Sequence, residues 1–224
     1  MSISLTSRMP PARTREQTVV DAFHELYYTR GAQSTWQNTR WLGVAAFKCP
    51  LDLWVYQEII YEQSPDVIVE CGTCLGGSTL FLASLCDLLG RGRVLTIDID
   101  PPEGKPQHPR ITYLQGSSTA PETIACLRGL IGEHEKVLVI LDSDHHRDHV
   151  LSELRLYAPM IRPGGYLIVE DTNINGHPVA GEFGPGPMEA VDAFLRENRD
   201  FVVDETREKF LMTFNPRGHL KRVK

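Results

Sequence analysis

The sequence has few of the features that would direct a protein to a membrane, to nucleic acid or to an oxidising compartment. No apolar run approaches the roughly 20 residues of a membrane span, and the N-terminus MSISLTSRMPPARTREQ lacks the apolar core of a secretory signal. Basic residues are not in excess, because 23 Lys and Arg face 29 Asp and Glu, for a formal net charge of −6. Five cysteines, an odd number, make no disulfide framework. We therefore expect a cytoplasmic protein without a membrane span or a nucleic-acid partner.

The chain does contain a regular alternation of β-branched runs and helical stretches. With 224 residues it is long enough for one sizeable domain. Near-continuous apolar strands separated by helices predict a parallel sheet covered on both faces. We predict an α/β fold with a doubly wound, mostly parallel sheet of about seven strands, helices on both faces and an antiparallel edge pair. The predicted strands begin at Asp66, Arg93, Ile111, Lys136, Gly165, Phe201 and Phe210. A small basic cluster at residues 217–224 is expected to be solvated.

A glycine-rich segment, ECGTCLGGST, follows the first predicted strand. In open parallel sheets, ligands bind beyond the carboxyl ends of the strands, and the first strand-to-helix turn carries the glycines. Glycines allow the backbone to turn tightly and approach a ligand, and a serine can cap the following helix. This pattern predicts a cofactor loop that includes Glu70, Gly72, Gly76 and Ser78.

The same segment contains Cys71-Gly-Thr-Cys74, which has a second interpretation as a redox pair. A thioredoxin-like dithiol also lies between a strand and a helix. The adjacent Glu70 would, however, raise the pKa of a thiol and so disfavour the reactive thiolate. We favour the interpretation of the cysteines as small fillers of the turn.

Polar residues at the ends of the next strands indicate the type of cofactor. Asp98 ends the second strand, where a carboxylate can accept both hydroxyls of a ribose. Ser117 and Ser118 end the third strand and suit an adenine edge, and Asp142 at the end of the fourth is also assigned to the cofactor. No P-loop lysine or other basic residue lies near the glycines, so the loop lacks the cationic groups that bind a polyphosphate. A nucleoside without phosphates, S-adenosylmethionine, fits better.

A second group of acids follows the fourth and fifth strands, in LDSDHHRDH and LIVEDTN. The carboxyl ends of adjacent parallel strands lie about 5 Å apart, so these acids should converge. Crowded carboxylates repel one another unless protonated or bridged by a cation, and an all-oxygen set suits Mg²⁺. We predict a magnesium site at Asp144, Glu170 and Asp171. The alternative is a set of acids that cap helix N-termini.

Four segments carry a family resemblance: WLGVAAFKCPLDLWVYQEII, ECGTCLGGSTLFLA, LDSDHHRDHVLSELRLYAPMIRPGGYLIVEDTNINGHPV and EFGPGPMEAVDAFL. With them, residues 36–215 resemble the cephalosporin hydroxylase family, a group of class I S-adenosylmethionine-dependent methyltransferases related to rhamnosyl O-methyltransferases. The resemblance implies a Rossmann-like methyltransferase domain over residues 51–224, preceded by a helical and loop extension over residues 1–50. It also implies Mg²⁺-dependent O-methylation of a hydroxyl on a small-molecule acceptor, either a sugar or a glycosylated secondary metabolite of the kind found in antibiotic biosynthesis. We expect a homo-oligomer.

Methyl transfer to a hydroxyl needs a base, and histidine suits that role because its unperturbed pKa lies near 6.5. His145, directly after a predicted metal ligand, is the first candidate, followed by His146 and His149. In metal-dependent catechol methyltransferases the base lies three residues after the aspartate, which here is Arg147, and arginine does not deprotonate. His177, in the long loop 172–187, is a candidate for contact with the acceptor.

Three other functions remain open at this point. A non-haem iron hydroxylase could use His146 and Asp148 with His177 or His219 as a facial triad, but such oxygenases usually carry this motif in a jelly roll. A non-catalytic, cofactor-binding subunit would leave the adjacent acids without a purpose. A glycosyltransferase could use the D-x-D of residues 142–144, although no basic phosphate ligands accompany it.

Overall fold

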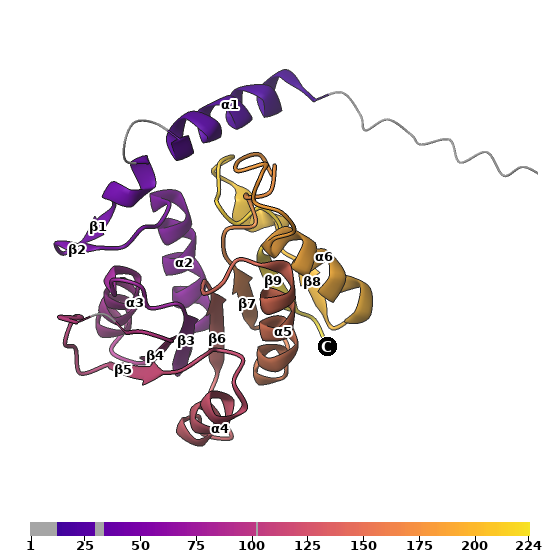
Figure 1. Ribbon diagram of the computed structural model, residues 1–224. Helices are drawn as coiled ribbons and strands as arrows, with labels where there is room; N and C mark the ends of the chain where they lie inside the picture. The colour runs from indigo at the N-terminus through magenta and orange to yellow at the C-terminus, as the bar shows by residue number, and fades with distance from the viewer. Residues whose placement is uncertain (1–12, 30–33, 102) are drawn as a thin grey trace, which may run out of the picture.

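The computed structural model describes residues 13–29, 34–101 and 103–224, and a seven-stranded sheet forms its centre (Figure 1). The strand order is β5-β4-β3-β6-β7-β9-β8. Strands β3 to β7 are parallel to one another, and β9 is antiparallel to both β7 and β8. This confirms the predicted α/β fold with its antiparallel edge. The strands are β3 (Val67–Cys71), β4 (Arg93–Asp98), β5 (Ile111–Gln115), β6 (Val137–Leu141), β7 (Tyr166–Val169), β8 (Phe201–Val203) and β9 (His219–Arg222).

Helices cover both faces of the sheet because successive side chains of each strand point to opposite faces. Val67 and Val69 of β3 pack toward one helical layer, whereas Ile68 packs toward the other. The first layer consists of α4 (Pro121–Leu130), α5 (Arg147–Tyr157) and α6 (Pro187–Glu197), and the second of α2 (Pro50–Gln63) and α3 (Gly77–Leu88). The strand order reverses at β3, so the loop after β3 lies at the switch point where ligands bind in such sheets.

The predicted extension packs against the domain. Its elements are α1 (Arg15–Thr29), the 3₁₀ turn η1 (Thr35–Asn38), β1 (Arg40–Trp41) and β2 (Val44–Ala45). Trp41 stacks edge-on against Phe81 of α3, with ring centroids 4.9 Å apart, and its indole donates to Ser84 Oγ at 3.0 Å. The next element, α2, begins at Pro50. Residues 1–12 and 30–33 of the extension lie outside the described residues.

The C-terminal part of the sheet differs from the sequence prediction in two respects. The segment that begins at Phe210 is not a strand, because Leu211 has a φ of +70° and Met212 and Phe214 pack into a separate apolar cluster near α1. Instead, β9 arises from the basic cluster that we expected to be solvated. His219 and Leu220 are fully buried there, whereas Lys221 and Arg222 are half-buried.

Two further 3₁₀ turns, η2 (Ala158–Met160) and η3 (Glu205–Glu208), complete the elements of the described residues. Within the described ranges, no helix is both long and apolar enough to cross a membrane.

Candidate active site

A cavity of about 410 Å³ lies at the carboxyl ends of β3 to β6. Its wall comes from the loop after β3, the end of β4, the turn after β5 and the loop after β6. Five of the residues that the sequence assigned to the cofactor line it: Gly72, Asp98, Ser117, Ser118 and Asp142.

Gly72 allows the loop after β3 to lie directly against the loop after β6. Its φ is +99°, and a Cβ atom at this position would come within 1.9 Å of the carbonyl oxygen of Asp142. Any other residue would therefore push the two loops apart and distort the floor of the cavity.

Asp98 fixes the same loop from the other side. Its Oδ2 accepts hydrogen bonds from the backbone N–H groups of Thr73 at 3.0 Å and Cys74 at 2.9 Å. Its Oδ1 accepts from the backbone N–H of Asp100 at 3.0 Å. The carboxylate thus shapes the cavity wall, a role that the sequence reasoning did not foresee, as well as facing the cavity.

The other three residues assigned to the cofactor do not line the cavity. The buried carboxylate of Glu70 accepts hydrogen bonds from the hydroxyls of Thr79 and Thr96, and burial raises its pKa. Gly76, with a φ of +82°, precedes α3, and Ser78 is buried in the first turn of that helix. Glu70 lies in β3, Gly76 at the N-cap of α3 and Ser78 in α3, so they belong to the elements on either side of the turn.

The two cysteines of the loop do not form a disulfide. Cys71 is buried and Cys74 is exposed, and burial raises the pKa of both thiols. A raised pKa disfavours the thiolate that redox chemistry requires.

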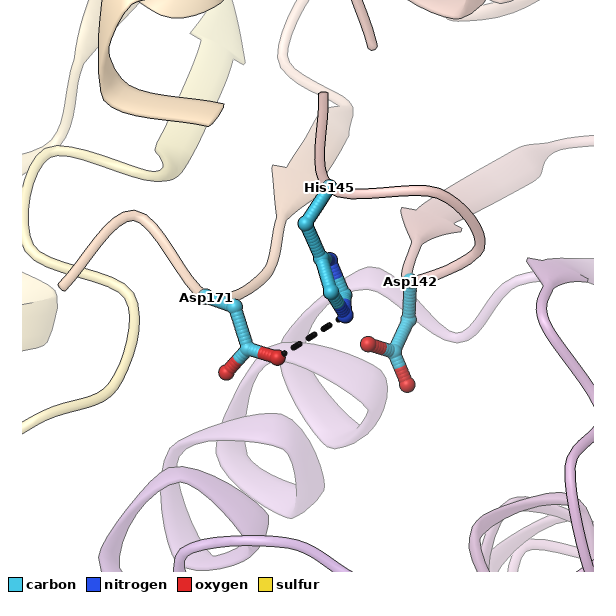
Figure 2. A group of neighbouring side chains, drawn as sticks. All are labelled: Asp142, His145 and Asp171. Carbon is cyan, nitrogen blue, oxygen red and sulfur yellow. Dashed lines mark ion pairs between the residues drawn. The ribbon is translucent and has the colours of Figure 1, made fainter. Parts of the chain in front are cut away.

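An acidic group lies next to the cavity, where the loops after β6 and β7 meet (Figure 2). Asp142, His145 and Asp171 each place a potential ligand atom within 4.8 Å of the others. Figure 2 shows the His145 ring hanging between the two acids, with its Nε2 3.2 Å from Asp171 Oδ2. Asp171 adopts a φ of +54°, and its backbone N–H donates to Asn215 Oδ1 at 3.0 Å. A side chain near the C-terminus therefore holds this unusual backbone conformation.

Lys48, which the sequence reasoning missed, joins this group from the loop before α2. Its buried ammonium donates to Asp142 Oδ2 and, at 2.6 Å, to Glu170 Oε2. Burial alone would lower the pKa of Lys48, but the two carboxylates raise it above its usual range. The only signal in the sequence is a single charge inside the apolar run GVAAFKCP.

Glu170 is buried beside Asp142. Burial, reinforced by Asp142, raises its pKa well above the usual value. Its Oε1 is buried without a hydrogen-bond partner among the described residues. An unpartnered carboxylate oxygen next to two further acids is the donor set that a hard divalent cation such as Mg²⁺ prefers. The residues therefore fit the predicted metal.

Asp144, the remaining predicted ligand, is not brought into this group. Its Oδ1 accepts from the backbone N–H of His146 at 2.8 Å and lies 2.6 Å from the Nδ1 of that ring. Although partial burial opposes the shift, these contacts lower the pKa of Asp144. His146 is largely exposed and lies against Phe183 of the long loop, with ring centroids 5.2 Å apart.

His149 lies on the wall of the cavity rather than in the acidic group. Its Nε2 is 3.0 Å from Ser118 Oγ, 3.3 Å from Ser143 Oγ and 3.5 Å from Glu153 Oε1. The hydrogen bond with Glu153 raises the pKa of His149 against the effect of burial. His177 lies 2.8 Å from Glu189 Oε1 and helps to hold the loop that carries it.

The open α/β sheet, with a cavity beside the glycine-rich loop at its switch point and a group of acids next to that cavity, is Rossmann-like. The model of the "Rhamnosyl O-methyltransferase/CmcI" family matches residues 33–223, and the chain belongs to this family. The family resemblance and the class predicted from the sequence, an S-adenosylmethionine-dependent O-methyltransferase, are thereby confirmed.

Curated relatives carry the same family name. A rhamnosyl O-methyltransferase of Mycobacterium leprae is 39% identical over 211 residues, which cover 92% of this chain and 91% of that protein. A rhamnosyl O-methyltransferase of Mycobacterium tuberculosis is 39% identical over 213 residues, which cover 91% of this chain and 85% of that protein.

Solved structures share the fold. A structure of CmcI with Mg and SAM superposes with a TM-score of 0.65 at 23% identity, over 99% of this chain and 89% of that chain. MycE of the mycinamycin biosynthetic pathway, solved with Mg and SAH, gives a TM-score of 0.51 at 20% identity, over 66% of this chain and 44% of that chain.

Proposed function

We propose that this protein transfers the methyl group of S-adenosylmethionine to a hydroxyl of a sugar or of a glycosylated natural product, in a Mg²⁺-dependent reaction. The observation that carries this function is the position of Asp142, which belongs both to the wall of the cofactor cavity and to the acidic group. A methyl donor in the cavity and a hydroxyl at the acids would therefore both lie next to the Asp142 side chain, and so close to each other.

The cavity suits the methyl donor. Methyl transfer from a sulfonium is an in-line displacement, so the acceptor oxygen must lie behind the methyl group and close to it. Asp98, Ser117 and Ser118 provide polar groups for a nucleoside. We assign His149 to this pocket, where its contact with Ser118 places it beside the predicted adenine edge.

We revise the predicted metal ligands to Asp142, Glu170 and Asp171. Asp144 faces His146 instead, whereas Asp142 takes part in the acidic group. Mg²⁺ at these carboxylates would stabilise the developing alkoxide of the acceptor. Named relatives and neighbours with rhamnosyl O-methyltransferase activity or with bound Mg and SAM or SAH support this cofactor pair.

His145 is the proposed base. Its Nε2 points into the acidic group, 3.2 Å from Asp171 Oδ2, which orients the ring and stabilises the imidazolium after proton transfer. Because Nε2 faces Asp171, the other ring nitrogen, Nδ1, would accept the hydroxyl proton. S-adenosylmethionine, when bound, would supply the methyl group, and its carbon–sulfur bond would break with the electron pair left on sulfur as the neutral thioether.

The hydroxylase alternative lacks a corresponding arrangement. His219 is buried in β9, His177 is paired with Glu189, and His146 lies with Asp144. Among the described residues, the cluster with metal-ligand spacing is Asp142, His145 and Asp171.

The test combines binding and turnover. We expect S-adenosylhomocysteine to bind in calorimetry with or without Mg²⁺, since Asp142 is the one side chain that the two proposed sites share and Asp98, Ser117 and Ser118 contact the cavity alone. Methylation of an alkyl rhamnoside should require Mg²⁺ and produce one S-adenosylhomocysteine per methyl ether. Hydroxylation of the acceptor, or methylation that survives exhaustive chelation, would contradict the proposal.

We also propose a homo-oligomer and a cytoplasmic location. Three large apolar side chains at helical spacing, Val19, Phe23 and Leu26, are more than half exposed on α1 and would suit a second copy of the chain. All five cysteines are free, as expected in a reducing compartment. Sedimentation of the purified protein as a monomer at micromolar concentration would contradict the oligomer.

A further inference from the structure

The acidic group already contains a cation of its own. Lys48 reaches it from the loop between β2 and α2, and its side chain is only 6% exposed. Its ammonium contacts one oxygen of Asp142 and one of Glu170. Both of these carboxylates belong to the proposed magnesium ligands.

The charges of the group explain why a buried lysine is tolerated there. Lys48 is the ion-pair partner of both Asp142 and Glu170, and Glu170 is buried with little solvent around it, so loss of Lys48 would leave these carboxylate oxygens without their cation. The ammonium removes one charge and occupies two carboxylate oxygens with hydrogen bonds. Asp171 and the unpartnered Glu170 Oε1 have no contact with it.

We propose that Lys48 is a built-in counter-cation that holds Asp142 and Glu170 in place in the metal-free protein and competes with Mg²⁺ for the same carboxylates. The inference rests on the magnesium site proposed above. Lys48 is a positioning residue, since it acts on the metal ligands and not on the reacting atoms.

Two consequences follow from this arrangement. The metal-free site stays folded because the acids are already partly neutralised. Binding of Mg²⁺ is weaker than three carboxylates alone would give, because the ion must approach a fixed positive charge and share its oxygens. The protein thus binds Mg²⁺ less tightly, but the carboxylates that bind the ion are already in position before it binds.

The experiment measures thermal unfolding of the wild type and of Lys48→Met at pH 8.5, each with and without saturating Mg²⁺. We expect the metal-free Lys48→Met protein to unfold at a lower temperature than the wild type. We expect its gain in Tm on addition of Mg²⁺ to be at least about twofold larger, because a ligand stabilises more when it binds the folded state more tightly. A Mg²⁺ titration by calorimetry should give a lower Kd for the variant.

Arg207→Met provides the matched control. Arg207 is another mostly buried cation that pairs with two acids, Glu62 and Asp204, and it lies outside both the cavity wall and the acidic group. Its loss should lower Tm by the same amount with and without Mg²⁺. If Lys48→Met does not fold, Lys48→Gln takes its place, since an amide can still donate to the same oxygens.

The outcomes separate this inference from the proposed function. An equal or smaller Mg²⁺-dependent gain in the Lys48 variant would overturn the counter-cation role and leave Lys48 as a structural residue or an aid to metal binding. A wild type that shows no Mg²⁺ binding in either measurement would instead overturn the magnesium site, and the inference with it.

Discussion

Substitution of Asp98 by alanine should weaken both the fold and the cofactor site. The Oδ2 atom of Asp98 holds two backbone N–H groups of the loop after β3, at 3.0 and 2.9 Å. Thr73 is buried, so its N–H would lose its partner without access to water, at a cost of about 1–3 kcal/mol of unfolding free energy. Cys74 is exposed, so its N–H can bind water instead and contributes less.

The effect on the cofactor adds to the effect on the fold. If Asp98 also accepts hydrogen bonds from the ribose, the loss of these charge-assisted bonds should cost about 1.5–3 kcal/mol of binding, or about 10- to 150-fold in Kd. Asp98→Asn tests the two roles separately, because the amide oxygen can still accept from the loop but carries no charge. We expect the Asn variant to regain most of the stability and little of the affinity.

The assay pairs thermal or urea unfolding with calorimetric titration of S-adenosylhomocysteine. Ile99→Ala, on the same cavity wall, is a control for a general disturbance of the pocket. A folded Asp98→Ala protein that binds S-adenosylhomocysteine as tightly as the wild type would refute the ribose contact. An unchanged unfolding free energy would refute the loop contact.

Three further predictions concern the base, the metal and the extension. His145→Ala should lower kcat by about 10²- to 10⁴-fold, as expected for a general base, with little change in S-adenosylhomocysteine affinity. His149→Ala should instead mainly weaken S-adenosylhomocysteine affinity, and the reverse pattern would contradict both assignments. Asp171→Ala should reduce methyl transfer as far as chelation does, and chelation of the variant should add little, because both remove the same interaction; additive losses would argue against a shared role. Burial lowers the pKa of His24 in α1 from 6.5 to about 4, and the neutral ring accepts a hydrogen bond from Asn173 Nδ2 at 2.9 Å. The stability that neutral His24 contributes is therefore complete above pH 6.5 and is lost as the pH falls through about 4. His24→Gln should reduce the acid-dependent loss of stability in urea unfolding between those values, and an identical pH profile would count against it.

The parallel strands could be predicted because each is a short, self-contained apolar run. Polar residues at the end of such a run, such as Asp98 and Asp142, could also be placed near the cavity, since the ends of parallel strands share one edge of the sheet. The prediction depended only on local pattern and on sheet topology.

The precise partners within the site could not be predicted in this way. Asp142 and Asp144 are two residues apart in the same loop, and only the loop geometry decides which of them meets Asp171 and which meets His146. Lys48 is separated from Asp142 by 94 residues, and no periodicity links the two. β9 was missed because His219, Lys221 and Arg222 look like a solvated tail, although Leu220 provides the buried contact.

The position of β9 between β7 and β8 has a consequence for the order in which the molecule can form during synthesis. β8 precedes β9 in the chain but pairs only with it, so β8 has no neighbour in the sheet until residues 219–222 have left the ribosome. Asn215, which supports the backbone of Asp171, lies just before that strand. The nascent chain can therefore assemble β3 to β7 and the cofactor cavity first, while the acidic group acquires its final shape only with the last strand.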